Sequence, residues 1–174
     1  MKIHEPGNHL DHMLRQTRMH HVHLSMMADT KANILLTMSS VLITLSVPHI
    51  LEPAFHLAVI VLISFCLATI ALAGYALMPK TPLTLRPPAA PDVRSPDFNL
   101  LFFGDFARLS WAEYEATMEE MMNDPSATYQ AQVRELYTLG RFLARRKYRV
   151  LRLAYLSFIT GLFASAGVGV IVVF

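Results

Sequence analysis

The 174-residue chain has a single cysteine, Cys66, so it can form neither an intrachain disulfide framework nor a cysteine-rich metal site. Its net charge of +2 is too small to indicate a nucleic-acid partner. Charge is also absent locally, because Asp, Glu, Lys and Arg are all missing from residues 32–51, 53–79 and 153–174. With 53% hydrophobic residues, this composition excludes an ordinary soluble domain and indicates a protein of the lipid bilayer.

Each charge-free stretch has the length of a membrane span. At about 1.5 Å per helical residue, each covers the hydrocarbon core of a bilayer, which is about 30 Å thick. We therefore predict an all-α membrane protein with three transmembrane helices, at residues 32–51, 53–79 and 153–174. Because Glu5, Asp11 and Asp29 precede the first stretch, it is expected to be a retained span and not a signal peptide.

The Lys and Arg residues predict the orientation of these spans. All of them lie before residue 32 or between Lys80 and Arg152, and the turn at residues 47–53 has none. The positive-inside rule then places the N-terminus in the cytoplasm and Phe174 on the periplasmic side of a multi-pass protein.

Two cytoplasmic segments are expected to be mainly helical. Residues 80–98 form a proline-rich linker, and residues 99–152 form a helical module in which Ser110 and Glu113 have capping-box spacing and start a helix that ends near Met122. A second helix is predicted to run from Ser126 into the third span, with a seam of residues at alternating spacings of four and three. The seam consists of Tyr129, Val133, Leu136, Gly140, Leu143, Lys147 and Val150. The N-terminal arm, residues 1–31, is predicted to be helical from about Leu10 and to pack with this module as a small helical stalk.

The first span carries a polar stripe, which consists of Asn33, Thr37, Ser40 and Thr44 and continues from Asp29. At about 100° per residue, these positions lie within about 80° of one another. Two interpretations fit this stripe. The polar side chains either bond to backbone carbonyls and neighbouring helices, or line a water-filled path in an assembly of several copies.

The third span carries small residues four apart, at Ser157, Gly161, Ser165 and Gly169. This helix-packing ridge permits the close approach of a second helix, from the same chain or from another copy. Since so small a membrane domain leaves surface to share, we expect a homo-oligomer.

The remaining polar residues do not indicate catalysis. The N-terminal arm contains a group of histidines at positions 9, 12, 20, 21 and 23, but a helix scatters them over several faces, so no metal site is predicted. No nucleophile and base form a recognisable pair, so the chain is not expected to be an enzyme. The basic cluster Arg145, Arg146, Lys147, Arg149 and Arg152 either anchors the chain at lipid headgroups or neutralises a bound phosphate.

Three motifs, taken together, resemble a known family. They are ADTKANILLTMSSVL at residues 28–42, NLLFFGDFARLSWAEYEATM at 99–118 and RRKYRVLRLAYLSFITGLF at 145–163. In this order, they resemble the transmembrane effectors of Pycsar, the bacterial pyrimidine-cyclase antiphage systems. The resemblance implies a protein of the bacterial inner membrane that senses cyclic UMP or cyclic CMP made by a partner cyclase. Activation would then disrupt the membrane and stop the infected cell, as in abortive infection.

The resemblance also suggests where the nucleotide binds. The ADxKA motif lies where a cytoplasmic helix enters the membrane, and the FFGDF motif follows the linker. Lys or Arg suits the phosphate, Asp the ribose hydroxyl, and an aromatic or Arg face the base. The candidate ligand-binding residues are Asp29, Lys31, Asn33, Phe103, Asp105, Arg141, Arg145 and Arg146.

Two alternatives stay open at this point. Asp29 either serves the ligand or forms a salt bridge within the stalk, and Lys31 either binds phosphate or extends to lipid headgroups. The whole protein is either this ligand-gated effector or a non-sensing membrane scaffold that binds another protein through its stalk. Saturable binding of a cyclic pyrimidine nucleotide would separate the two functions.

Overall fold

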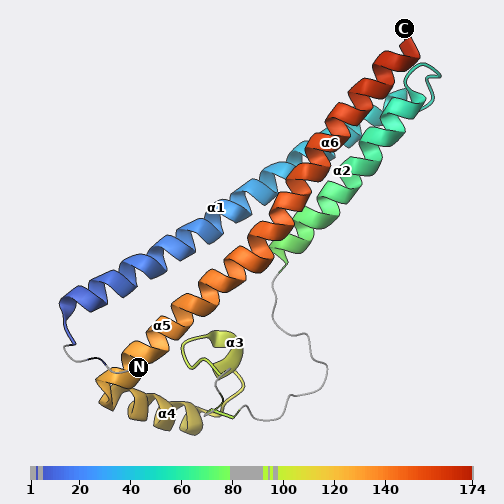
Figure 1. Cartoon of the computed structure of the whole chain (residues 1–174). Helices are drawn as coiled ribbons and strands as arrows, with labels where there is room; N and C mark the ends of the chain where they lie inside the picture. The colour runs from blue at the N-terminus through green and yellow to red at the C-terminus, as the bar shows by residue number, and fades with distance from the viewer. Residues whose placement is uncertain (1–2, 4–5, 79–91, 94, 96–97, 174) are drawn as a thin grey trace. The chain divides into compact units, whose positions relative to one another are not determined.

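The computed structural model describes residues 3, 6–78, 92–93, 95 and 98–173. Figure 1 shows its helices, and the residues that it describes include no strand. The elements are α1 (Asn8–Ser46), a 3-10 turn (Val47–His49), α2 (His56–Leu77), α3 (Phe103–Phe106), α4 (Trp111–Asn123), α5 (Pro125–Phe142), a π-helical segment (Leu143–Lys147) and α6 (Tyr148–Val173). Three of the helical lengths are long and apolar enough to cross a membrane. The predicted all-α membrane fold is thus confirmed.

The chain divides into two compact units. The first consists of Met1–Val22 and Pro79–Arg141, and the second of His23–Met78 and Phe142–Phe174. Helix α1 contributes residues to both units, and the charge-free stretches of the three membrane-length helical regions lie in the second unit. Most of the proline-rich linker, predicted at residues 80–98, lies outside the described residues.

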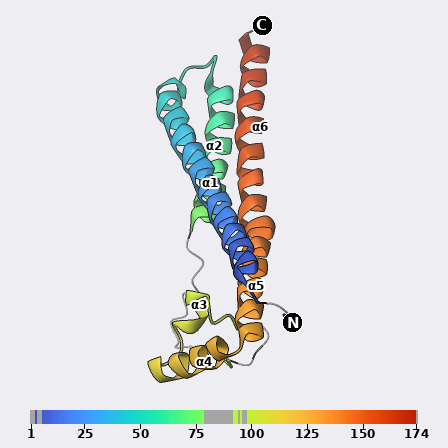
Figure 2. The same cartoon turned by 90° about the vertical axis from the view of Figure 1, so that its left-hand side faces the viewer.

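The core of the second unit is built from three helices that lie side by side (Figures 1 and 2). Its buried members are Ala28, Ala32 and Leu35 from α1, Ala73 from α2, and Leu151, Ala154 and Phe158 from α6. Four of these seven residues are alanines, which let the helices approach closely, and two leucines and one phenylalanine fill the space between them. The second unit is therefore a closely packed three-helix bundle.

Helices α2 and α6 approach closely at Gly161. A methyl group added there would lie 2.4 Å from Cβ of Phe65, well inside contact distance. On either side, the Ser157 hydroxyl donates to the Phe65 carbonyl at 3.3 Å, and the Ser165 hydroxyl donates to the Ala58 carbonyl at 2.9 Å. Small residues thus let backbone and side chain of the two helices make direct polar contact.

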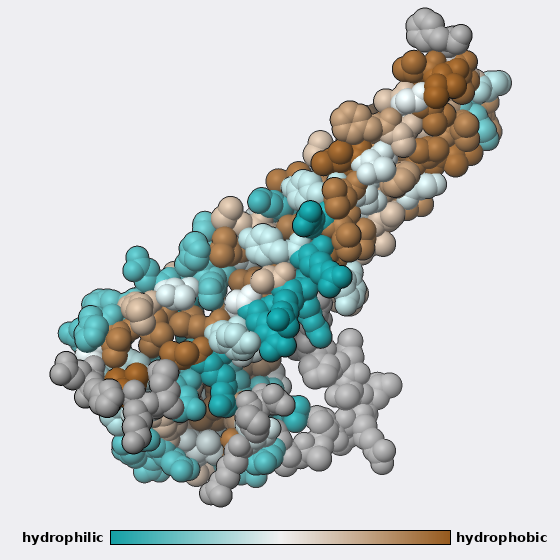
Figure 3. Space-filling model, in the orientation of Figure 1, coloured by the Kyte–Doolittle hydropathy of each residue, from teal (hydrophilic) through white to brown (hydrophobic). Residues whose placement is uncertain are grey.

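The outer surface of this bundle is apolar. Leu51, Phe163 and Ile171 are among the most exposed large hydrophobic residues, and Figure 3 shows hydrophobic residues gathered along the helices toward the C-terminus. Such a surface suits lipid, because hydrocarbon tails provide the apolar contact that water does not. The structure supports membrane insertion by length and composition, while the exact membrane limits of each span remain predictions.

In the first unit, the beginning of α1 contacts α5. The Tyr129 hydroxyl donates to Asp11 Oδ1 at 2.7 Å, and Arg18 Nη2 lies 3.0 Å from Glu135 Oε1. The hydrogen bond to Asp11 raises the pKa of Tyr129, because the carboxylate acceptor favours the protonated phenol. These contacts pair the two helices locally, whereas the placement of a stalk below the membrane remains a prediction.

The local signals around α4 are confirmed. The Ser110 hydroxyl accepts from the Glu113 backbone N–H at 3.3 Å, and the Ser110 backbone N–H donates to Glu113 Oε2 at 2.9 Å. This reciprocal capping box starts α4, which ends at Asn123, one residue beyond the predicted end. Pro125 then occupies the first position of α5, where a missing backbone N–H costs no hydrogen bond.

The predicted long helix into the third span is continuous but not uniformly wound. Residues Leu143–Lys147 form a π-helical segment, whose hydrogen bonds enclose one more residue than those of an α-helix. Leu143 and Lys147 on the predicted seam are buried, but the next buried position is Leu151, and Val150 is only half-buried. The expected seam is therefore wrong at Val133, which is exposed. After Lys147 its buried position is Leu151 in place of the half-buried Val150, because the π-helical turn shifts the register of the helix.

Candidate functional site

The central polar feature of the second unit is a buried ammonium group. Lys147 Nζ lies 2.7 Å from Oδ1 and 2.8 Å from Oδ2 of Asp29, and donates to Ser25 Oγ at 2.7 Å. The Lys147 side chain is only 10% exposed, whereas that of Asp29 is 40% exposed. The ammonium therefore has hydrogen-bond acceptors on two residues, Asp29 and Ser25, and its charge is paired with the Asp29 carboxylate. We call Ser25, Asp29 and Lys147 the junction cluster.

A further hydrogen bond joins α1 and α6 beside the junction cluster. The Tyr148 hydroxyl donates to the backbone carbonyl of Leu24 at 2.9 Å. Lys147 is the last residue of the π-helical segment and Tyr148 is the first of α6, so two consecutive side chains bond to one turn of α1. The irregular winding thus coincides with the polar contact between α1 and the last membrane helix, and π-helical turns frequently occur at functional sites.

Asp29 is consequently not paired with Lys31, although the two are neighbours in the ADxKA motif. Lys31 is exposed, as are Arg145 and Arg146 in the π-helical segment. Within the described part of the chain, no ion pair or hydrogen bond joins any of these three cations to a protein group. Three candidate ligand residues in this unit therefore have their charges available, while the candidate Asp29 already has a partner.

The polar stripe lies on the outside of the bundle. Asn33, Thr37, Ser40 and Thr44 are all exposed, whereas Ser39, on another face of the same helix, is fully buried. The Thr37 hydroxyl donates to the Asn33 carbonyl at 3.0 Å, and the Thr44 hydroxyl donates to the Ser40 carbonyl at 3.0 Å. The side-chain amide of Asn33 makes no hydrogen bond within the part of the chain described here. The stripe is thus satisfied in part within α1, and it does not pack against α2 or α6.

The helix-packing ridge behaves differently, because it faces α2 of the same chain. Ser157, Gly161 and Ser165 make the contacts with Phe65 and Ala58 described above. Near Gly169 the approach is looser, since an added methyl group would lie 3.9 Å from Cβ of Ala58. The ridge therefore contributes to packing within one chain.

The remaining candidates, Phe103, Asp105 and Arg141, belong to the first unit. Asp105 Oδ2 accepts from the Asn99 backbone N–H at 3.0 Å, which closes the turn before α3. Phe103 is exposed and lies with its ring centroid 5.0 Å from that of Phe102, and Arg141 is exposed at the end of α5. Asp105 has a structural role in this turn, and the ligand contacts of all three remain predictions.

The described residues include no group of three His, Cys, Asp or Glu side chains that could hold a metal ion. The histidines at positions 9, 12, 20, 21 and 23 therefore do not form such a group.

Comparison with known families decides the relationship. The model of the Pycsar effector protein domain matches residues 12–174, which is nearly the whole chain. The chain belongs to the Pycsar effector family. The searches of curated proteins and of solved structures found no match to the chain. The predicted resemblance is thus confirmed, and this Pycsar effector is a membrane protein by its three long apolar helices.

Sequence reasoning found Asp29 in this effector but not its partner. Lys147 was expected on the helix seam and in the basic cluster, and its pairing joins positions 118 residues apart. One signal was available, because a lysine on an otherwise apolar seam needs a buried acceptor. Asp29 is the last acidic residue before the first charge-free stretch, and it meets that need.

Proposed function

We propose that this Pycsar effector senses a cyclic pyrimidine mononucleotide, cyclic UMP or cyclic CMP, and disrupts the bacterial inner membrane in response. The observation that carries the proposal is the family match over residues 12–174. A partner cyclase would supply the nucleotide during phage infection, and loss of membrane integrity would stop the infected cell. The proposal assigns the effector no chemical reaction of its own.

The cations next to the junction cluster are the proposed phosphate contacts. Lys31, Arg145 and Arg146 are exposed and have no protein partner within the described residues. A cyclic mononucleotide carries one negative phosphate, which such side chains bind through charge-assisted hydrogen bonds. Lys147 is not proposed as a contact, because its ammonium is nearly buried and already bonds to Asp29 and Ser25.

Helix α1 offers a route from this site to the membrane. It carries both Asp29 of the junction cluster and the polar stripe without an intervening break. Binding that favours one arrangement of the cluster would rotate or tilt the stripe as part of the same helix. Taking a switch from about 1% to 99% active requires about 5.5 kcal/mol of differential binding, which several copies in an oligomer can share.

A homo-oligomer is proposed because the stripe is exposed in the single chain. In a single chain within the bilayer, the side-chain amide of Asn33 would face hydrocarbon without a partner. Burying a polar group in an apolar medium is unfavourable. Neighbouring copies would cover the stripe, or line a water-filled path with it. This arrangement accounts for both a stable resting assembly and a damaging active one.

The proposed orientation places the N-terminus in the cytoplasm and the C-terminus in the periplasm. Cysteine labelling tests it, because Cys66 is the single cysteine and lies buried in α2. After Cys66→Ala, cysteines are introduced separately at Leu51 and Glu119, which are both exposed. A membrane-impermeant maleimide added to spheroplasts should label position 51 and spare position 119. Equal labelling of both positions would contradict the orientation.

The function itself is tested by nucleotide binding and by membrane potential. Purified protein in lipid nanodiscs should bind cyclic UMP or cyclic CMP saturably, and cells that express it should lose membrane potential only when a cyclase supplies the nucleotide. Lys31→Ala, and Arg145→Ala with Arg146→Ala, should weaken binding about ten- to hundredfold, because each charged contact contributes about 1.5–3 kcal/mol. Arg15→Ala is the matched control, since Arg15 is an exposed cation earlier in α1. Absence of saturable binding by the unmodified protein would refute the sensing function.

A further inference from the structure

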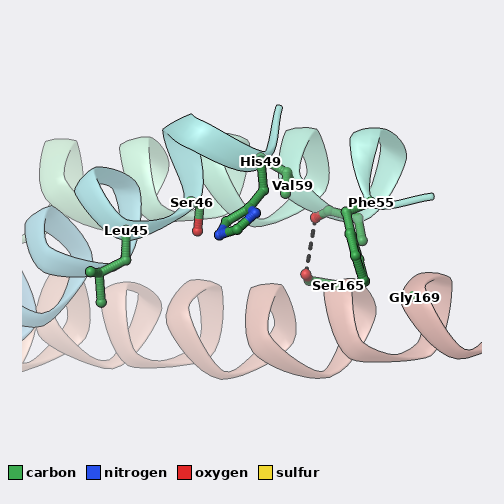
Figure 4. Close-up of a pocket in the computed structure, with 8 residues that line it drawn as sticks. Leu45, Ser46, His49, Phe55, Val59, Ser165 and Gly169 are labelled. Atoms are coloured by element: carbon green, nitrogen blue, oxygen red, sulfur yellow. Dashed lines mark hydrogen bonds between the residues drawn. The ribbon is translucent and has the colours of Figure 1, made fainter. Parts of the chain in front are cut away.

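A groove lies at the end of the bundle where α1 turns into α2. It has a volume of about 370 Å³ and lies between this turn and the last third of α6. Its lining residues are Leu45, Ser46, His49, Phe55, Ala58, Val59, Ser165 and Gly169. Figure 4 shows Ser46 and His49 between Leu45 and Phe55, with Ser165 and Gly169 on the opposite helix. The volume falls within the range of about 300–1,000 Å³ that is typical of ligand sites.

The groove exists because α6 lies closer to α2 at Gly161 than at Gly169. At Gly161 the helices are so close that a methyl group would collide with Phe65. At Gly169 the nearest atom to such a methyl group is Ala58 Cβ, at 3.9 Å, and no side chain of α6 fills the space. The Ser165 hydroxyl is already bonded to the Ala58 carbonyl, so it offers little to a polar ligand. The walls are therefore mainly apolar.

The position of the groove indicates what kind of molecule fills it. All of its lining residues lie in the charge-free stretches or in the turn that joins two of them. Beside a bilayer, an apolar groove of this kind takes hydrocarbon, because a void forfeits dispersion contacts and water finds few polar partners. A lipid acyl chain supplies that hydrocarbon directly from the surrounding membrane.

The polar rim indicates which headgroup accompanies the chain. His49 Nδ1 lies 2.9 Å from Glu52 Oε1, and both side chains are about half exposed. Because a carboxylate only accepts hydrogen bonds, Nδ1 carries the proton, and Nε2 of a neutral ring is an acceptor. With the ring neutral, the pair presents acceptors and one negative charge, that of Glu52. No Lys or Arg occurs in residues 32–79 or 153–174, so no cation is available here for a lipid phosphate.

From these observations, we propose that the groove binds one phospholipid with a primary ammonium headgroup, phosphatidylethanolamine. Its acyl chain occupies the space beside Gly169, and its ammonium donates to Glu52 and His49. A quaternary ammonium has no N–H to donate, and an anionic headgroup meets a carboxylate without a compensating cation. Most of the first charge-free stretch separates His49 and Glu52 from Asp29 of the junction cluster, and the site does not depend on nucleotide sensing.

Retained lipid provides the test. The full chain is reconstituted in nanodiscs with equal amounts of phosphatidylethanolamine, phosphatidylglycerol and phosphatidylcholine, extracted in mild detergent, and examined by native mass spectrometry. One phospholipid should remain per chain, with phosphatidylethanolamine enriched about two- to fivefold, since half-exposed ionic contacts contribute up to about 1 kcal/mol. Retention of the three lipids in the proportions of the bilayer would overturn the headgroup assignment.

Two variants separate the acyl-chain site from the headgroup site. Gly169→Leu fills the groove and should abolish retention, whereas Gly167→Leu, at a position with no atom within 4 Å of an added methyl group, should retain lipid as the unmodified protein does. Glu52→Gln, in the exposed turn, should retain lipid but lose the selectivity. If Gly169→Leu does not fold, the Glu52→Gln result decides, and unchanged selectivity in it would overturn the proposal. Full retention by a folded Gly169→Leu variant would also overturn it.

Discussion

Lys147 Nζ is shared between both carboxylate oxygens of Asp29, at 2.7 and 2.8 Å, although the two residues are 118 positions apart in the chain. The ammonium is nearly buried and the carboxylate is not. Removing Asp29 therefore leaves an unpaired charge that is buried, whereas removing Lys147 leaves an unpaired charge that water can reach.

This asymmetry predicts unequal effects of single substitutions. Asp29→Ala leaves a buried ammonium without its counter-charge, and should lower the free energy of unfolding by about 3–5 kcal/mol. Lys147→Met leaves a carboxylate that is 40% exposed and can be hydrated, so about 1 kcal/mol is expected. Unfolding in mixed micelles, followed by far-ultraviolet circular dichroism, measures both values. The double variant should resemble Lys147→Met alone, and strictly additive effects would contradict the pairing.

Gly161 is predicted to be the least replaceable small residue of α6. Gly161→Ala places a methyl group 2.4 Å from Phe65 Cβ, which cannot move without the helix backbone, and should destabilise the bundle by about 1–3 kcal/mol. Gly167→Ala is the matched control on the same helix. It meets no atom and should be neutral or stabilising by up to about 1 kcal/mol through helix propensity. Equal stability of the two variants in the same micelle assay would show that the approach of α2 is not close.

The polar stripe should be required for membrane damage and not for nucleotide binding. Asn33→Leu, Thr37→Val, Ser40→Ala and Thr44→Val, introduced together, remove the exposed polar groups and leave the packed face of α1 unchanged. Nucleotide affinity should stay within about threefold, while depolarisation measured with a potential-sensitive dye is lost. Ser64→Ala controls for the loss of an exposed hydroxyl that bonds to its own helix. A stripe variant that assembles and still depolarises the membrane would show that the stripe lines no path.

The capping box of α4 predicts a pH dependence. The backbone N–H and the hydroxyl of Ser110 bond to Glu113 and hold its pKa below the ordinary value. The capping contribution is therefore full above about pH 4.3, the ordinary glutamate pKa, and is lost as the pH falls through the lower pKa of the folded state. Amide hydrogen exchange in the first turn of α4 should accelerate over that interval relative to the intrinsic rate. Glu113→Gln should remove the pH dependence, and its persistence in that variant would assign it to another group.

Local features of the fold were predictable because they depend on neighbours in the sequence. The capping-box spacing of Ser110 and Glu113 predicted the start of α4, and the end predicted near Met122 is one residue short of the observed end at Asn123. The lengths of the charge-free stretches predicted three membrane helices, since both length and composition are set by the bilayer.

The junction cluster was only half predictable, because its geometry depends on tertiary contacts. Asp29 stood out beside a charge-free stretch, but the choice of Lys147 over Lys31 depends on how α6 packs against α1. The π-helical segment has no reliable sequence pattern, and the extra residue that it introduces moved the buried seam from Val150 to Leu151. The polar stripe was visible in sequence, but its exposure could be established only once the neighbours of α1 were known.

The bundle core has a consequence for biosynthesis, because its contributors come from both ends of the chain. Ala32 and Ala73 are synthesised before the whole segment from Pro79 to Arg141, whereas Ala154 and Phe158 are synthesised after it. The hairpin of α1 and α2 must therefore enter the bilayer with its packing surface unoccupied and wait for α6. During that interval the inserted hairpin lacks the Lys147 partner of Asp29, so the docking of α6 is the step that first neutralises this carboxylate within the bundle.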